Sequence, residues 1–250
     1  MGSMELSFCV RAWAAWAPGV ERREDWQAWA LAPAPAPLPA GDGMPALADV
    51  PALQRRRLSR LGRAVLQVVM SVQQARADLP MVFASRYGDV ERALTAIEAL
   101  EQGEPLSPTV FAGSVHNAIG AMHSIIGGHR QNMICIAAGA SNAAAAMVEA
   151  AGLLADGADE VLVACYDEPL PPPYDTFADA PQALYAWAWR VARADASAPA
   201  LRLSRHTAGA GGAVAAHLPP DLAVLRWLLG EQPTLEQSDG GLAWRWSRDA

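Results

Sequence analysis

The stretch MICIAAGASNAAAAMVEAAGLLADGADEVLVAC, residues 133–165, contains an ordered series of segments. Met133 to Ala137 is an apolar run of strand length, Ala138 to Asn142 is a turn of small residues, and Ala143 to Ala155 is an alanine-rich helix. Glu160 to Cys165 is a second apolar strand. This order predicts a right-handed crossover unit. Its turn lies beside a helix N-terminus, where α/β proteins place reactive groups.

This unit resembles the nucleophile region of β-ketoacyl synthases of the thiolase-like superfamily. In that family the first strand ends in a turn that carries an acyl-accepting cysteine, and an Asn opens the preceding helix. Without gaps, the Asn falls on Asn117 and the cysteine falls on Ala140. Alanine cannot form a thioester, so the resemblance implies a degenerate active-site turn without a catalytic residue. That turn consists of Gly139, Ala140, Ser141 and Asn142.

Two flanking motifs narrow the resemblance. Phe111 to Ala118 reads F-A-G-S-V-H-N-A, and Tyr166 to Pro169 reads Y-D-E-P. Both are similar to motifs of the short β-ketoacyl-synthase-like proteins called chain length factors, which occur in aryl polyene type systems. The similarity is strong over residues 50–185, and residues 186–250 form a divergent C-terminal extension.

The domain organisation follows from this similarity. Residues 1–3 look like an expression scar, and residues 4–250 are expected to form a single domain like the N-terminal half of a β-ketoacyl synthase. The resemblance implies a three-layer α/β/α thiolase-like half-fold with a mixed, mainly parallel sheet of about five strands. A complete ketosynthase has a second half that brings two histidines for decarboxylation. No repeat of the crossover unit or matching histidine motif is present in this sequence.

The resemblance therefore implies a non-catalytic subunit that pairs with a catalytic ketosynthase and forms part of the wall of its acyl tunnel. In the thiolase-like fold the strand at Met133 to Ala137 pairs across the dimer axis, so that one sheet continues through both chains. The side chains of Ala143 to Ala146 are so small that another backbone must pack closely against them. In the thiolase-like fold that neighbour includes the partner subunit.

A cationic run is a candidate docking patch for an acyl carrier protein or for an acidic surface of the partner. The alternative is an ordinary solvated helix face, which such runs usually form. The run comprises Arg55, Arg56, Arg57 and Arg60.

Several polar residues have a structural interpretation. Ser114 is expected to cap a helix that runs from about Asn117 to Ile126. His116 and Asn117 are expected to hydrogen-bond loop backbone and to fix the approach to the turn at Ala140. Asp167 and Glu168 are adjacent in a strand, so they should point to opposite faces and not share one site.

A different class of function remains open. Gly139 to Ala143 superficially resembles the G-x-S-x-G elbow of α/β-hydrolases, with Ser141 as nucleophile, Asp167 as acid and His206 as base. The last small residue of the elbow is alanine, and no oxyanion loop of the H-G-G type is visible. A homodimer of the isolated chain without another partner is the third alternative.

Bulk properties exclude some classes. The formal charge of −7 argues against nucleic-acid binding, and no apolar run reaches the roughly 20 residues that a membrane span needs. The three cysteines, Cys9, Cys135 and Cys165, lie in apolar runs without a C-x-x-C pair. We therefore expect reduced thiols, no metal, no cofactor and a cytoplasmic location.

The remaining segments yield further expectations. A long helix should open at Asp49 to Pro51 and bury the stripe Leu58, Leu61, Val65, Val68 and Val72. The helix at 90–100 should turn Leu94, Ile97 and Leu100 inward, and residues 209–212 form a glycine-rich turn. Strands are expected at 6–16, 80–85, 183–191, 201–203 and 242–246, and helices at 21–30 and 220–229.

Overall fold

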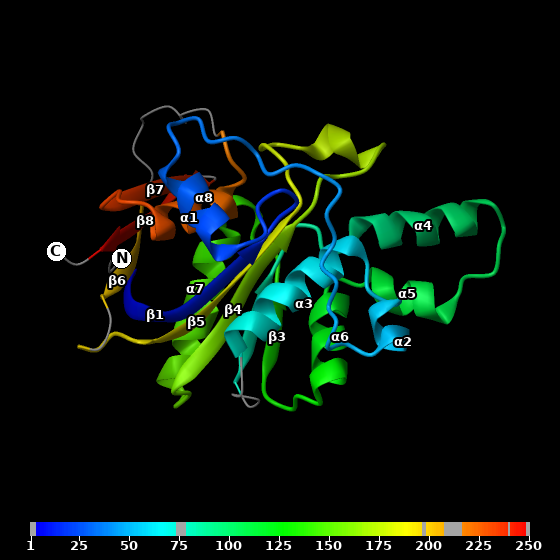
Figure 1. Cartoon of the computed structure of the whole chain (residues 1–250), viewed down its shortest axis with the longest axis horizontal. Helices are drawn as coiled ribbons and strands as arrows, with labels where there is room; N and C mark the ends of the chain where they lie inside the picture. The colour runs from blue at the N-terminus through cyan, green and yellow to red at the C-terminus, as the bar shows by residue number, and fades with distance from the viewer. Residues whose placement is uncertain (1–3, 74–78, 197–198, 208–216, 240, 249–250) are drawn as a thin grey trace.

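The computed structural model describes residues 4–73, 79–196, 199–207, 217–239 and 241–248 (Figure 1). The predicted turn at 209–212 lies outside these residues. Within them one sheet has eight strands. In spatial order these are β3 (Met133–Ile136), β2 (Met81–Ala84), β4 (Glu160–Asp167), β5 (Tyr185–Arg193), β1 (Met4–Trp16), β6 (Leu201–Thr207), β8 (Leu242–Arg248) and β7 (Thr234–Asp239).

The strand directions confirm a mixed α/β sheet but correct two details. The sheet is larger than the expected five strands, and only β2 runs parallel to both of its neighbours, β3 and β4. Every other adjacent pair among the described strands is antiparallel. The reason lies after β4, where the chain returns as β5 without a crossover helix and must therefore pair antiparallel.

Helices cover both faces of the sheet, which confirms the three layers (Figure 1). Side chains of α3 and α6 pack on one face, and those of α7, α8 and α1 pack on the other. The helices are α1 (Arg23–Leu31), α2 (Ala52–Arg55), α3 (Arg60–Gln73), α4 (Val90–Glu101), α5 (Pro108–Ser114), α6 (Ala118–Gly127), α7 (Asn142–Ala155) and α8 (Pro220–Leu229), with 3-10 turns η1 (Gly139–Ser141) and η2 (Tyr174–Phe177).

Large and small side chains alternate along β5 and lie on its two faces. Tyr185, Trp187 and Trp189 belong to the core beneath α7 and α8, whereas Ala186 and Ala188 belong to the core beneath α3. The indole rings of Trp187 and Trp189 stack with their centroids 4.5 Å apart. The large side chains therefore fill the core beneath α7 and α8, and the small alanines contribute to the core beneath α3.

The central crossover unit forms as predicted, from β3 through η1 and α7 to β4. Ala143, Ala144 and Ala146 are almost fully buried within this chain. The chain's own sheet and α8 therefore supply a close backbone for these three alanines, while Ala145 is half-buried.

The expected long helix after Asp49 is divided into α2 and α3. The Ser59 hydroxyl accepts a hydrogen bond from the amide of Gly62 at 3.0 Å, which caps a new helix start. The apolar stripe of α3 is buried as predicted, since Leu61, Val65 and Val68 are at most 1% exposed.

The interpretation of α4 was wrong in part. Ile97 and Leu100 are 49% and 58% exposed, and only Ala96 of this helix is buried. The helix pair α4–α5 extends from the side of the sheet that carries β3 and lies away from β6–β8 (Figure 1). The amphipathic pattern of α4 therefore reflects an apolar surface that the described part of the chain leaves exposed.

Among the described residues, no helix combines the length and apolarity needed to cross a membrane.

Candidate functional site

The turn at Ala140, comprising residues 138–142, joins the carboxyl end of β3 to the start of α7. Gly139 has φ +57°, a left-handed conformation that glycine adopts without strain. The amide of Ala138 donates to Asn142 Oδ1 at 2.5 Å, and the side chain of Asn142 is fully buried. Gly139 itself is exposed. The buried side chain of Asn142 thus holds the turn from the core side, while Gly139 faces solvent.

The C-terminal hairpin β7–β8 holds Ser141. Its hydroxyl donates to Asp239 Oδ2 at 3.0 Å and accepts a hydrogen bond from Trp244 Nε1 at 3.1 Å. Sequence reasoning missed β7 and both partners, because the contacts span about a hundred residues of sequence.

The hypothetical hydrolase triad is not assembled. His206 Nε2 pairs with Glu236 at 3.2 Å, and Asp167 binds the turn after β2. No hydrogen bond among the described residues joins a histidine to Ser141. The alternative of a serine nucleophile therefore lacks its general base.

Asp221, at the start of α8, occupies the N-terminus of α7. Its Oδ1 accepts the amide of Ala143 at 3.0 Å, and its Oδ2 accepts the Tyr185 hydroxyl at 3.3 Å. The side chain is 2% exposed. Burial raises the pKa of Asp221 to about 6, while the hydrogen bond from Ala143 opposes that rise. In the sequence, the only sign of this residue's position at a helix start is that it follows Pro219 and Pro220.

The two motifs that flank the crossover unit converge on a different turn, residues 85–89 after β2. Asp167 Oδ1 accepts the Ser85 hydroxyl at 2.8 Å and the amide of Arg86 at 3.0 Å. His116 Nε2 lies 2.9 Å from the Ser85 carbonyl, and Gly88, with φ +67°, packs against His116. His116 therefore binds loop backbone as expected, but it orders this turn instead of the turn at Ala140.

Ser114 does not cap α6 as expected, and the side chain of Asn117 does not hydrogen-bond the backbone at this helix start. Ser114 is the last residue of α5, and its hydroxyl donates to the Phe111 carbonyl at 2.9 Å. Asn117 occupies the position before α6, but its side chain makes no capping hydrogen bond. The reason is that Ser114 belongs to a separate short helix, α5, which begins at Pro108 and ends before α6 starts.

Asp167 and Glu168 border the same small cavity, contrary to the expectation from strand alternation. Both are more than nine-tenths buried, and Glu168 lies just beyond the end of β4, where alternation no longer applies. Burial, followed by the charge of Asp221, raises the pKa of Asp167 to about 7. Burial, followed by the charges of Asp89 and Glu91, raises the pKa of Glu168 to about 8.

These two carboxyl groups predict a pH-dependent stability. A raised folded-state pKa means that the protonated form stabilises the fold, fully below the ordinary pKa near 4 and progressively less as pH rises through 7 and 8. The melting temperature should be lower by about 5 °C at pH 8.5 than at pH 5.5. Glu168→Gln should flatten this slope in thermal melts, whereas the exposed control Glu98→Gln should not. A steeper slope in Glu168→Gln would contradict this assignment.

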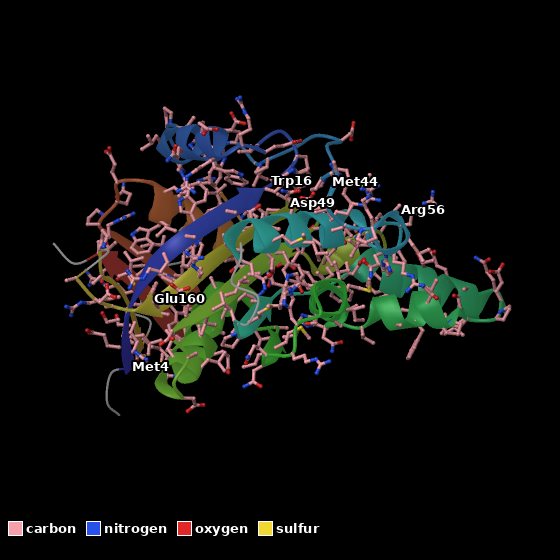
Figure 2. All side chains as sticks on the ribbon, turned by 60° about the horizontal axis from the view of Figure 1, so that its bottom comes forward. Met4, Trp16, Met44, Asp49, Arg56 and Glu160 are labelled. Carbon is pink, nitrogen blue, oxygen red and sulfur yellow. The ribbon has the colours of Figure 1, made fainter. Side chains whose placement is uncertain are left out.

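The cationic run is only partly available for docking. Arg55 Nη1 donates to the Leu47 carbonyl at 3.0 Å, and Arg60 Nε donates to the Gly43 carbonyl at 3.0 Å. Arg56 and Arg57 are exposed, and Arg56 lies at the surface on the side that carries α4 (Figure 2). The predicted four-residue patch therefore reduces to two exposed cations, because the others order the loop before α2.

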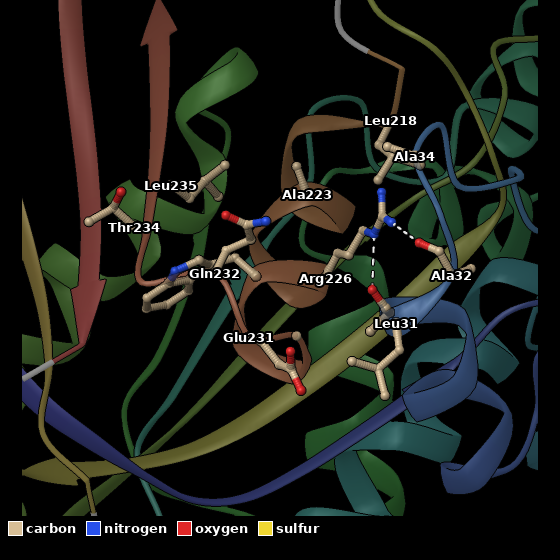
Figure 3. A pocket seen from close by; sticks show the side chains of 13 residues that line it. Leu31, Ala32, Ala34, Leu218, Ala223, Arg226, Glu231, Gln232, Thr234 and Leu235 are labelled. Atoms are coloured by element: carbon tan, nitrogen blue, oxygen red, sulfur yellow. Dashed lines mark hydrogen bonds between the residues drawn. The ribbon is translucent and has the colours of Figure 1, made fainter. Parts of the chain in front are cut away.

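A separate groove of about 430 Å³ lies between α1, α8 and β7 (Figure 3). Its main cation, Arg226, donates to the carbonyls of Ala30 and Ala32 and so ends α1. The lining is mostly apolar, with Leu218 and Leu235 at its sides. This arrangement explains how α1 is attached to α8.

Among the described residues, no group of three or more His, Cys, Asp or Glu side chains is placed to hold a metal ion.

Comparisons with known proteins identify the family and the fold. The family model "Beta-ketoacyl synthase, N-terminal domain" matches residues 26–247. A chain of the solved structure "Ketosynthase (ApeO) in Complex with its Chain Length Factor (ApeC) from Xenorhabdus doucetiae" is 26% identical, with a TM-score of 0.84; the alignment covers 97% of this chain and 100% of that one. No curated protein matches at a significant level.

Two more distant structures share the fold. A β-ketoacyl synthase from Burkholderia phymatum STM815 is 14% identical, with a TM-score of 0.60; the alignment covers 83% of this chain and 66% of that one. The ishigamide ketosynthase/chain length factor is 16% identical, with a TM-score of 0.61 and coverage of 81% and 67%.

Proposed function

Because the chain belongs to the family of β-ketoacyl synthase N-terminal domains, we propose that it is a non-catalytic, chain-length-factor-like subunit. In this role it pairs with a catalytic ketosynthase and shapes the acyl tunnel in aryl polyene type biosynthesis. One correspondence supports the proposal: in the ungapped resemblance to β-ketoacyl synthases, the acyl-accepting cysteine falls on Ala140, whose methyl group cannot form a thioester. The aryl polyene assignment depends on the two flanking motifs.

The edge of the sheet supports a partner. Among the described strands β3 is a terminal one. The amides of Met81 and Ser85 donate to the carbonyls of Asn132 and Ile136. Since bonding alternates along a parallel strand, the backbone groups of Met133 and Cys135 point away from β2. An edge with unpaired backbone groups is a template for another strand. We infer that the ketosynthase supplies that strand.

Exposed apolar side chains near this edge support the same surface. Gly120 of α6 packs against the sulfur atoms of Met133 and Cys135, so α6 lies directly over β3. On α6 and the adjoining α5, Ile125 and Phe111 are 66% and 57% exposed. Exposed apolar side chains on the helices beside a sheet edge favour a protein–protein contact there.

The similarity to a ketosynthase–chain length factor complex is consistent with this arrangement. The matched chain is aligned over its whole length, so the present chain is of comparable size. The test is co-expression with a catalytic ketosynthase from the same organism, followed by affinity purification and native mass spectrometry. A 1:1 complex is expected. Separate elution of the two proteins, or a homodimer that excludes the ketosynthase, would contradict the proposal.

We further propose that Arg56 and Arg57 attract an acidic acyl carrier protein to the complex. The double variant Arg56→Glu/Arg57→Glu should weaken carrier binding about tenfold and reduce its dependence on salt. Arg245→Glu on β8 is the control, since Arg245 is also exposed but lies toward the other edge of the sheet. Unchanged binding in the double variant, measured by fluorescence anisotropy at two salt concentrations, would remove this patch.

A further inference from the structure

Two carboxylates of the C-terminal part surround the turn at Ala140. Asp221 accepts the amide of Ala143, three residues after Ala140, at 3.0 Å. Asp239 Oδ2 lies 3.0 Å from the Ser141 hydroxyl and 3.6 Å from the point where a Cβ on Gly139 would lie. One carboxylate therefore lies under the start of α7, and the other contacts residues on both sides of position 140.

The charge balance at this turn decides what it can hold. A helix N-terminus is equivalent to about half a positive charge, which lowers the pKa of a nearby thiol and stabilises anions. Here the amide of Ala143 is already bonded to a buried carboxylate. Each carboxylate carries up to a full negative charge, so the two together outweigh the helix end.

We propose that Asp221 and Asp239 make the turn at Ala140 repellent to anions, so that it would not activate a nucleophile even if a cysteine were restored. This inference rests on the proposed non-catalytic role and gives an electrostatic reason for it besides the missing thiol. A thiolate at position 140, or an oxyanion formed beside it, would meet negative charge from α8 and from β7. Carrier-bound substrates with an acidic group would be directed to the partner's active site instead of this turn.

The other ionisable groups around Asp221 do not reverse this sign. Asp167, Cys165 and Tyr185 face it from β4 and β5 and contribute negative charge or none. Arg86 is the cation that stabilises the ionised form of Asp221, but its guanidinium is bonded to Asp179. With a pKa of about 6, Asp221 is mostly ionised at pH 8.

The experiment introduces the missing thiol. The variant Ala140→Cys is treated with iodoacetamide from pH 6 to pH 10, and modification is located by tandem mass spectrometry. The pKa of the new thiol is expected at about 9 or above, compared with about 8.5 for a free cysteine. Adding Asp239→Asn should lower that pKa by about 0.5 to 1 and raise the alkylation rate at pH 7 about three- to tenfold. Asp221→Asn should act in the same direction.

Controls separate charge from disruption. Glu236 lies on the same strand as Asp239, but its carboxylate pairs with His206. Glu236→Gln should therefore leave the pKa of the thiol at position 140 unchanged. Asp239→Asn keeps a hydrogen-bond acceptor for Ser141 and lies at a half-buried position, so it serves if Asp221→Asn does not fold. The unmodified chain reports background from its own cysteines, of which Cys135 has a pKa raised to about 11 by burial.

A pKa below about 7.5 for the thiol introduced at position 140, with both carboxylates present, would overturn the inference, because the helix end would then dominate. The inference would also fail if neither Asp→Asn change moved that pKa. Binding to the ketosynthase is measured in each variant. Failure of the unaltered chain to bind contradicts the proposed function, whereas a low thiol pKa in a variant that still binds contradicts only this inference.

Discussion

Replacing Cys135 by proline is expected to abolish assembly with the ketosynthase while the isolated chain stays folded. The backbone N–H of Cys135 points away from β2, so its loss leaves the β2–β3 ladder intact. Proline is tolerated at such a position of an edge strand. A partner strand, however, would lose one hydrogen bond and meet the pyrrolidine ring, which should weaken the complex at least about 100-fold, or about 2.7 kcal/mol.

The matched control is Cys135→Ala, which removes the same thiol and keeps the N–H. It should bind the ketosynthase within about threefold of the unaltered chain, because only side-chain packing changes. Both variants are compared by isothermal titration calorimetry and by thermal melts. Tight binding of Cys135→Pro, with the fold intact, would place the interface elsewhere on the molecule.

Trp246→Ala should destabilise the isolated chain by about 3–5 kcal/mol, the largest stability effect that we predict. Trp246 is fully buried on β8, and its ring contacts the rings of Phe8, Trp189 and Trp227 edge-on or tilted. Its indole N–H donates to Gln237 Oε1 at 2.9 Å. The substitution leaves a cavity where three strands and α8 meet, and it removes the partner of Gln237.

A chain of this size should lose about 10 °C in melting temperature from that change. The control is Leu242→Ala on the same strand, where the side chain is 45% exposed and the expected loss is within about 0.5 kcal/mol. Urea denaturation, followed by tryptophan fluorescence, measures the free energy of unfolding of both variants. Equal small losses would mean that β8 is a dispensable addition and not part of the core.

The crossover unit from Met133 to Cys165 is predictable because its signals are local. Apolar runs, a small-residue turn and an alanine-rich helix each depend on neighbours within a few residues. The alternation along β5 has the same origin, and its large and small residues lie in the cores on the two faces of the sheet. Serine is a typical residue at a helix start, but the apolar stripe begins at Leu58, before the Ser59 cap, and so predicts one longer helix.

The polar contacts were not predictable because they join residues far apart in the sequence. Asp221 and Asp239 reach the turn at Ala140 only through the C-terminal strands and α8, which the sequence pattern treated as a divergent extension. Residues from 185 onward in fact contribute half of the described strands of the sheet, most of them antiparallel to both neighbours. The exposed Ile97 and Leu100 show a further limit, since periodicity reports an apolar face but not what covers it.

The most direct test of a subunit without its own chemistry is intact-mass analysis of the purified chain after incubation with an acyl thioester. In the absence of a ketosynthase, we expect no added acyl mass and no consumption of the thioester. An acyl adduct would contradict the account, as would hydrolysis that is lost in Ser141→Ala.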